Sequence, residues 1–194
     1  MPAGQTGSVP VIVFTTVPVT NVTFVFTVTP DRLGSFALAP PAPPLALATL
    51  QPLAGDQFQV RLGTLPGLSL AGEQAVSALR FIAAPGQSSA FVPLAVSDVS
   101  GTQNTGQPVP RTAGNDGRVV YLGAEPLLEL LRHEPQCRLL LFGRPAPSYT
   151  VESTLNLTPG VTWTPLWTGP SSNLVEVFLL APTNQAQFFR AVSP

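Results

Sequence analysis

The feature of this chain that most constrains its fold is a two-residue alternation of side-chain types in short segments. Residues 21–29 read Asn-Val-Thr-Phe-Val-Phe-Thr-Val-Thr, so a large apolar side chain occupies every second position from Val22 to Val28. Successive side chains of a β-strand point to opposite faces, and β-branched and aromatic residues favour strands. The segment is therefore predicted to be a strand that buries one face.

A second β-branched run, residues 9–16, precedes it and contains Pro10, and the dipeptide Val17-Pro18 follows it. Proline cannot donate a ladder hydrogen bond, which confines it to edge strands, strand starts and bulges. We therefore expect residues 9–16 to form a separate edge strand that ends at Val17-Pro18. Its pairing with a partner would involve Val11, Val13 and Thr15.

Further short segments of strand character are separated by Pro, Gly, Asn or Ser. Residues 39–44 read Ala-Pro-Pro-Ala-Pro-Pro and predict a rigid connection, whereas residues 85–89 predict a hairpin loop between the strands on either side. No segment sustains a helical period, and the best helix candidate, residues 125–133, is short. We expect an all-β protein with two tandem antiparallel β-sandwich domains, residues 1–123 and 124–194. The additional strands are expected at residues 57–62, 78–83, 91–96, 118–122, 127–131, 137–142, 149–153, 162–167, 175–180 and 187–192.

Charged residues are scarce: they make up 10% of the 194 residues, against roughly 25% in a typical soluble domain. The formal net charge is −1, so no basic surface is available to hold nucleic acid or an anionic membrane. No apolar run approaches the roughly 18–20 residues of a membrane-spanning helix. A single cysteine, Cys137, excludes an internal disulfide framework.

The N-terminal region resembles a known family in three segments. They are Asn21-Val-Thr-Phe-Val-Phe-Thr-Val-Thr-Pro-Asp31-Arg-Leu33, a strand running into an aspartate turn, then Ala78-Leu-Arg-Phe81-Ile-Ala and the later Gly117-Arg-Val-Val-Tyr. Over residues 8–122 this pattern resembles the cohesin-like and related carbohydrate-binding β-sandwiches of exported bacterial proteins. In this chain the proline precedes Asp31, which inverts the family's dipeptide. The resemblance implies a sandwich that binds other proteins or sugars.

The C-terminal region resembles a small β-sandwich module found at the ends of large exported bacterial proteins. The matching segments are Gly143-Arg-Pro-Ala-Pro-Ser-Tyr149, Ser153-Thr-Leu, Trp163-Thr-Pro-Leu166 and Phe188-Phe-Arg-Ala191. Ala146 and Phe189 stand where the module has glycine and tyrosine. The resemblance implies an extracellular or cell-surface location, although the start of this chain shows no export signal.

No catalytic, cofactor or metal site is predicted. His133 and Cys137 are four residues apart, but the proline at position 135 argues against a helix that would align them as a nucleophilic pair. One histidine and one cysteine cannot supply the usual zinc ligands. Asn115-Asp116-Gly117 is interpreted as a turn, because the ligand ladder of a calcium loop is missing. We therefore expect no enzymatic activity.

Two functions remain as hypotheses. The first is a non-enzymatic extracellular structural or adhesive protein, in one form a self-assembling, filament-type subunit, that binds copies of itself or another surface protein. The scarcity of charge favours it, since a subunit covered by its neighbours can leave apolar residues on its surface. The alternative is a carbohydrate-binding module in which Trp167, Tyr121 and Tyr149 contact a sugar or partner. Trp163 and Trp167 are four residues apart and are expected on the same side of a continuous strand, unless Pro165 between them bends it. The resemblance to the C-terminal module implies that Trp163 lies in its core.

Overall fold

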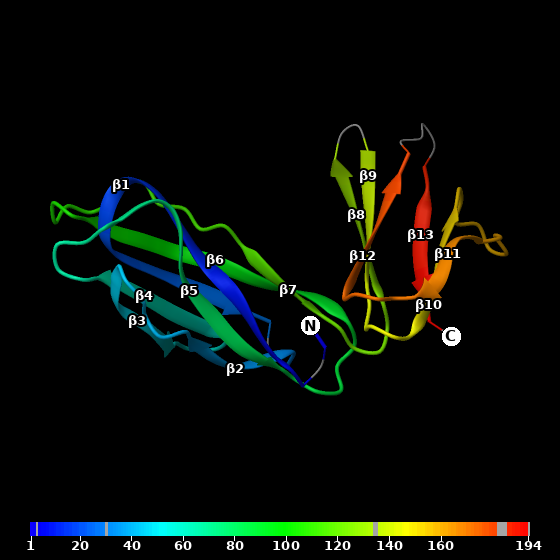
Figure 1. The fold of residues 1–194 in the computed structure, drawn as a ribbon, viewed down its shortest axis with the longest axis horizontal. Coiled ribbons are helices and arrows are strands. Elements are labelled where there is room, and N and C mark those ends of the chain that lie inside the picture. The colour runs from blue at the N-terminus through cyan, green and yellow to red at the C-terminus, as the bar shows by residue number, and fades with distance from the viewer. Residues whose placement is uncertain (3, 30, 134–135, 182–185, 194) are drawn as a thin grey trace. The chain divides into compact units, whose positions relative to one another are not determined.

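The computed structural model describes residues 1–2, 4–29, 31–133, 136–181 and 186–193, with the side chain of His133 outside this set, and it is all-β as predicted. Within these residues no helix has both the length and the apolar character to cross a bilayer. The chain divides into two compact units (Figure 1). The N-terminal unit comprises Gly4–Pro85 and Phe91–Val119, and the C-terminal unit comprises Val120–Pro194 together with Met1–Ala3 and Gly86–Ala90.

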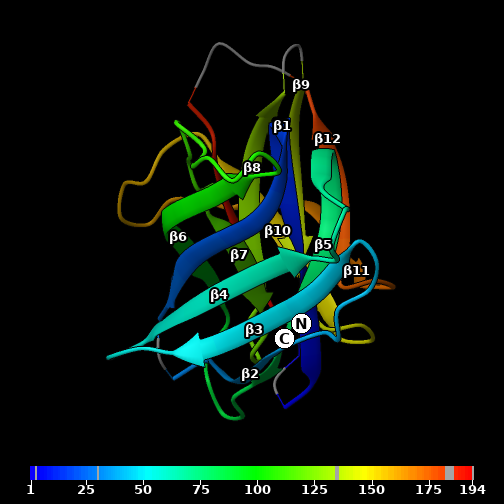
Figure 2. The ribbon, with the colours of Figure 1, turned by 90° about the vertical axis from the view of Figure 1, so that its left-hand side faces the viewer.

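The N-terminal unit is built around one long strand, β1, which spans Thr6–Val28. Its strands pair in the order β2-β5-β1-β4-β3, and β6 pairs with β1 and β7 (Figure 2). The pairings of β1 with β4, β5 and β6 are all antiparallel. The other strands are β2 (Leu33–Leu38), β3 (Leu45–Pro52), β4 (Gln57–Thr64), β5 (Leu70–Ala83), β6 (Ala90–Gln103) and β7 (Gly117–Tyr121).

The prediction that residues 9–16 and 21–29 form two separate strands is wrong, because β1 runs through both. Its first part pairs with β5 from Thr6 to Thr15, and its second part pairs with β6 on one side and β4 on the other. The register with β5 shifts between Val11 and Ile12, where the extra residue belongs to β5 and β1 continues without interruption, and it shifts again between Thr15 and Val19. Val17-Pro18 lies in this irregular stretch, where the missing proline N–H interrupts no regular ladder. One strand therefore serves two parts of the sheet.

The hairpin predicted across residues 85–89 is also wrong. The loop does connect β5 to β6, but β5 pairs with β1 and β2, whereas β6 pairs with β1 and β7. The first part of β1 takes β5 as its neighbour and the second part takes β6. The loop is therefore a crossover, and the local turn signal could not distinguish it from a hairpin.

Aromatic packing closes the core of the N-terminal unit. The rings of Phe26 and Phe58 stack with their centroids 5.1 Å apart, and Phe36 contacts both from 5.7 and 4.9 Å. Phe36 belongs to β2, which the sequence pattern did not predict. The sequences Leu-Gly-Ser-Phe-Ala-Leu of β2 and Leu-Ala-Leu-Ala-Thr-Leu-Gln-Pro of β3 contain few β-branched residues, so their strand signal is weak.

The described residues of the C-terminal unit form six strands, and all six predicted segments match them to within a few residues. They form two three-stranded sheets, β12-β9-β8 and β11-β10-β13. Leu139 and Leu141 of one sheet and Tyr149 and Val151 of the other make a shared buried cluster. The strands are β8 (Leu127–His133), β9 (Gln136–Phe142), β10 (Ser148–Thr154), β11 (Thr164–Pro170), β12 (Val175–Leu180) and β13 (Phe188–Val192).

A tyrosine locks the turn between β9 and β10. The Tyr149 hydroxyl accepts a hydrogen bond from the Arg144 N–H at 2.9 Å and donates one to the Arg144 carbonyl at 3.3 Å. A Cβ added at Gly143 would lie 2.7 Å from Cε2 of the same ring. Only glycine lets the buried ring approach the backbone this closely.

Candidate functional site

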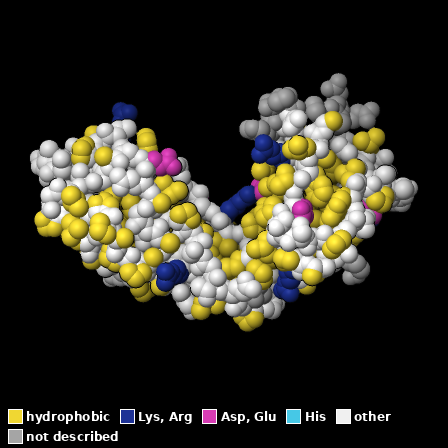
Figure 3. All heavy atoms as spheres, viewed as in Figure 1, with side chains coloured by type: hydrophobic (Ala, Val, Ile, Leu, Met, Phe, Trp, Pro, Cys, Tyr) yellow, Lys and Arg dark blue, Asp and Glu magenta, His cyan; other side chains and the backbone are white. Residues whose placement is uncertain are grey.

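An apolar groove of about 920 Å³ lies in the N-terminal unit, beside the first part of β1. Residues 9–14 of β1 form one wall, and residues 113–118 form part of the other side. Glu73, Asp116 and Arg118 are the charged side chains among its described lining. Charged side chains are few on the face of the molecule shown in Figure 3. The other lining residues include Val22, Phe24, Phe26, Leu38, Val60, Leu79, Leu94, Val96 and Val99.

The wall of residues 113–118 is fixed to β6. Oδ1 of Asp116 accepts a hydrogen bond from the Val96 N–H at 2.8 Å, and the Thr112 hydroxyl donates to the Val99 carbonyl. A Cβ at Gly114 would lie 2.6 Å from Cγ1 of Val96, so this segment passes close to the strand. Asp116 therefore anchors backbone. The turn predicted at residues 115–117 is not found, because residues 115 and 116 have no turn conformation and Gly117 begins β7.

The other wall is the edge of a sheet. Residues Thr6–Thr15 of β1 pair with β5, and in the described part of the chain no further strand pairs with this half of β1. The N–H of Ala39, next to β2, donates to the Ala78 carbonyl at 2.8 Å, so the backbone groups of Ala78 face β2. Pro10 lies opposite Ala78. Its carbonyl therefore faces away from β5, toward the open side.

Alternation along β1 extends this assignment to its neighbours. The backbone groups of Ser8, Ile12 and Phe14 face the same open side as those of Pro10. The backbone groups of the residues singled out from the sequence, Val11, Val13 and Thr15, instead face β5, and their side chains are half-buried. The open hydrogen-bonding groups thus belong to residues one position away from those predicted.

The outer face of the same strand carries two exposed apolar side chains. Ile12 is 54% exposed and Phe14 is 71% exposed. The segment Thr6–Thr16 contains no charged residue, although charged side chains are a common protection of edge strands. Pro10 is the one protective residue of this kind in the segment, because it removes a donor from the open side. The edge therefore combines unpaired backbone with apolar surface.

The three aromatic residues predicted to contact a sugar or partner lie mainly in the interior. Tyr121 is 0% exposed and Tyr149 is 1% exposed, so neither ring offers a face for stacking. Trp167 is half-buried against the core of the C-terminal unit, with its ring centroid 5.5 Å from that of Phe178. No aromatic platform is formed by these three side chains.

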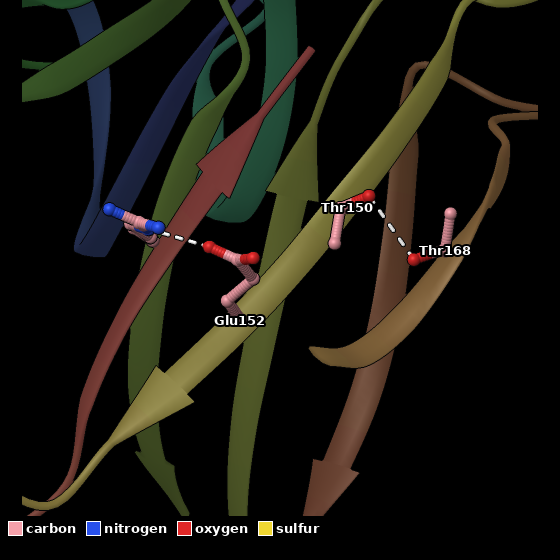
Figure 4. Close-up of polar contacts among 4 residues, drawn as sticks. Thr150, Glu152 and Thr168 are labelled. Carbon is pink, nitrogen blue, oxygen red and sulfur yellow. Dashed lines mark hydrogen bonds and ion pairs between the residues drawn. The ribbon is translucent and has the colours of Figure 1, made fainter. Parts of the chain in front are cut away.

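The two tryptophans do not share a side of a continuous strand, and the expectation that Trp163 lies in the core is wrong. The register shifts between Val151 and Glu152, opposite the segment from Pro165 to Trp167. Trp167 consequently packs on the core, whereas the Trp163 ring lies 4.4 Å from the guanidinium carbon of Arg190. Cross-strand polar contacts cover this outer face (Figure 4): Arg190 pairs with Glu152 at 2.6 Å, and the hydroxyls of Thr150 and Thr168 lie 3.1 Å apart.

Within the described residues, no three His, Cys, Asp or Glu side chains gather as a metal site. The pairing of His133 with Cys137 falls partly outside the described residues, because the His133 side chain and position 135 are not among them. Cys137 is a half-buried free thiol in β9.

Comparison with solved structures identifies a cohesin-like β-sandwich fold. A chain in the crystal structure of a CaDoc0917–CaCohA2 complex at pH 5.5 is similar with a TM-score of 0.55 and 13% identity, covering 62% of this chain and 92% of the other. A non-cellulosomal cohesin from the hyperthermophilic archaeon Archaeoglobus fulgidus is similar with a TM-score of 0.50 and 18% identity, covering 63% and 84%. No family model and no curated protein matches the sequence. The C-terminal module is not identified by these comparisons.

Proposed function

We propose that this chain is a non-enzymatic structural or adhesive protein that acts by binding another protein, and that the N-terminal unit is its binding module. The observation that carries the proposal is the apolar groove along the open edge of β1. Unpaired backbone groups give affinity for an extended segment, and pockets beside them select its alternate side chains. The groove therefore suits a β-strand supplied by a partner.

The fold supports a protein as the partner. The similar chain with a TM-score of 0.55 comes from the structure of a complex, CaDoc0917–CaCohA2. The composition also favours a protein partner. Only 10% of the residues are charged, so a monomer in water would have few charged side chains to cover its apolar surface. We place the protein outside the cell or on its surface, in keeping with the exported proteins that both of its regions resemble.

The test is a peptide selection, which works without an identified partner. The full chain, held through a C-terminal tag, is exposed to a displayed library of extended peptides. The binding of enriched peptides to two variants is then measured. Phe14→Arg puts a charge into the lining of the groove. Leu47→Arg is the control, because it changes a 47% exposed leucine of β3 that does not line the groove. We expect peptides in which apolar residues alternate with other residues. These peptides should bind the wild type and Leu47→Arg but should not bind Phe14→Arg. No enrichment, or equal binding to all three proteins, would refute the proposal.

A further inference from the structure

We infer that the partner at this groove is a second copy of the same chain, paired antiparallel through the first part of β1. This inference rests on the proposed function and adds the identity of the partner. In this arrangement the two β1 edges satisfy each other's open backbone groups, and each copy supplies the strand that lies beside the other's groove. Such a contact is isologous, with the same surface used by both copies.

The charges next to β1 favour a copy in the antiparallel direction. On β5, Arg80 lies opposite Ser8 and Glu73 lies opposite Phe14, and both charged side chains are exposed. Antiparallel pairing sets the arginine end of one copy beside the glutamate end of the other, at both ends of the contact. Parallel pairing would set arginine beside arginine. With strands about 4.8 Å apart the charges lie about 14 Å from each other, beyond a Debye length of about 8–10 Å, so they bias the orientation at low ionic strength and add little affinity.

The same charges select a register. Aligning Ser8 of one copy with Phe14 of the other puts the two-fold axis at Val11. Val9 then meets Val13 on the inner face, and Pro10 meets Ile12 on the outer face, so apolar side chains oppose apolar side chains on both faces. Each of the outer-face pairs forms backbone hydrogen bonds: Ser8 and Phe14 exchange two, and Pro10, which lacks the N–H, accepts one from Ile12.

Little opposes the approach of two copies. The net charge of the whole chain is −1, so electrostatic repulsion between copies is small. Pairing also covers Ile12 and Phe14, which are 54% and 71% exposed in the single chain. A long, uncharged, apolar edge is the kind of strand that recruits another edge.

A cysteine placed at the two-fold axis tests the register. In a Cys137→Ser background, which removes the chain's own thiol, Val11→Cys brings the two new cysteines face to face in a pair without backbone hydrogen bonds. The Cα atoms of such a pair are about 4.5 Å apart, within the range that a disulfide spans. Val13→Cys in the same background is the control, because its two copies lie four residues apart along the strand, at about 14 Å.

Mild oxidation of the full chain, followed by non-reducing electrophoresis, is expected to give a covalent dimer for Val11→Cys and monomer for Val13→Cys. Monomer for both variants, or equal dimer for both, would overturn the register and with it the inference.

Sedimentation velocity over a concentration series tests the contact without cysteines. We expect a reversible dimer that Phe14→Arg weakens by more than about tenfold, because a guanidinium replaces the apolar ring at the contact and, opposite Glu73 of its own copy, offsets the negative charge that faces Arg80 of the second copy. We expect no change for Leu47→Arg. If the chain is strictly monomeric, the inference that the partner is a second copy is refuted. The proposed function would still be supported by peptides that bind the wild type but not Phe14→Arg. A dimer that resists Phe14→Arg also overturns the inference.

Discussion

Replacing Ala146 by glycine should stabilise the C-terminal unit. Ala146 lies between two prolines in the turn from β9 to β10 and has a φ of 87°, in the left-handed region that L side chains disfavour. Its N–H donates to the Ser171 carbonyl at 3.1 Å, which ties this conformation to the neighbouring chain segment. The backbone at position 146 therefore suits glycine, which has no Cβ, better than alanine.

The size of the effect follows from two opposing terms. Holding an L residue in the left-handed region costs about 1–2 kcal/mol. Glycine loses more conformational freedom on folding than alanine, at a cost of about 0.5–1 kcal/mol. The difference predicts that Ala146→Gly raises the free energy of unfolding by about 0.5–1 kcal/mol, or the melting temperature by about 2–8 °C for a unit of this size.

Tryptophan fluorescence in urea provides the assay, because both tryptophans, Trp163 and Trp167, lie in the C-terminal unit. The control is Ala124→Gly. Ala124 is exposed and its φ is not positive, so this substitution should leave the free energy of unfolding unchanged or lower it. If Ala146→Gly lowers the midpoint, or moves it no more than the control does, the conformational argument fails.

Three further predictions concern packing and pH. Gly143→Ala should lower the stability of the C-terminal unit by about 1–3 kcal/mol, since its Cβ would lie 2.7 Å from the Tyr149 ring; urea unfolding followed by tryptophan fluorescence measures this, and an unchanged midpoint contradicts it. Phe26→Ala should cost the N-terminal unit about 3–5 kcal/mol by removing a ring that is 3% exposed and stacked on Phe58, which hydrogen exchange in that unit can follow. Hydrogen bonds from Ser172, first of all from its backbone N–H, lower the pKa of the Glu176 carboxyl. The ionised carboxylate therefore stabilises the folded state at pH values above its unfolded pKa. This stabilisation is lost as the pH falls through the folded pKa. Glu176→Gln should therefore flatten the acid side of the stability profile, and a parallel profile would count against this role.

The strands of the C-terminal unit could be predicted because their signal is local. Segments such as residues 175–180 and 137–142 are short, apolar and bounded by turn residues, and they became β12 and β9.

The candidate site was predicted less well. Pro10 correctly marks an edge, but which backbone groups of that edge are open depends on the pairing of β5 with β2, far away in the sequence.

What the sequence by itself determined is the all-β class and, through alternation, most of the strands, because side-chain periodicity is a property of consecutive residues. Only the tertiary structure decided that β1 continues through Val17-Pro18 and that the loop from β5 to β6 is a crossover and not a hairpin. It decided as well that a bulge lies between Trp163 and Trp167. It also decided that the edge of β1 stays open beside an apolar groove. These features depend on which strands become neighbours, and strand pairing joins residues whose separation along the chain leaves no periodic signal.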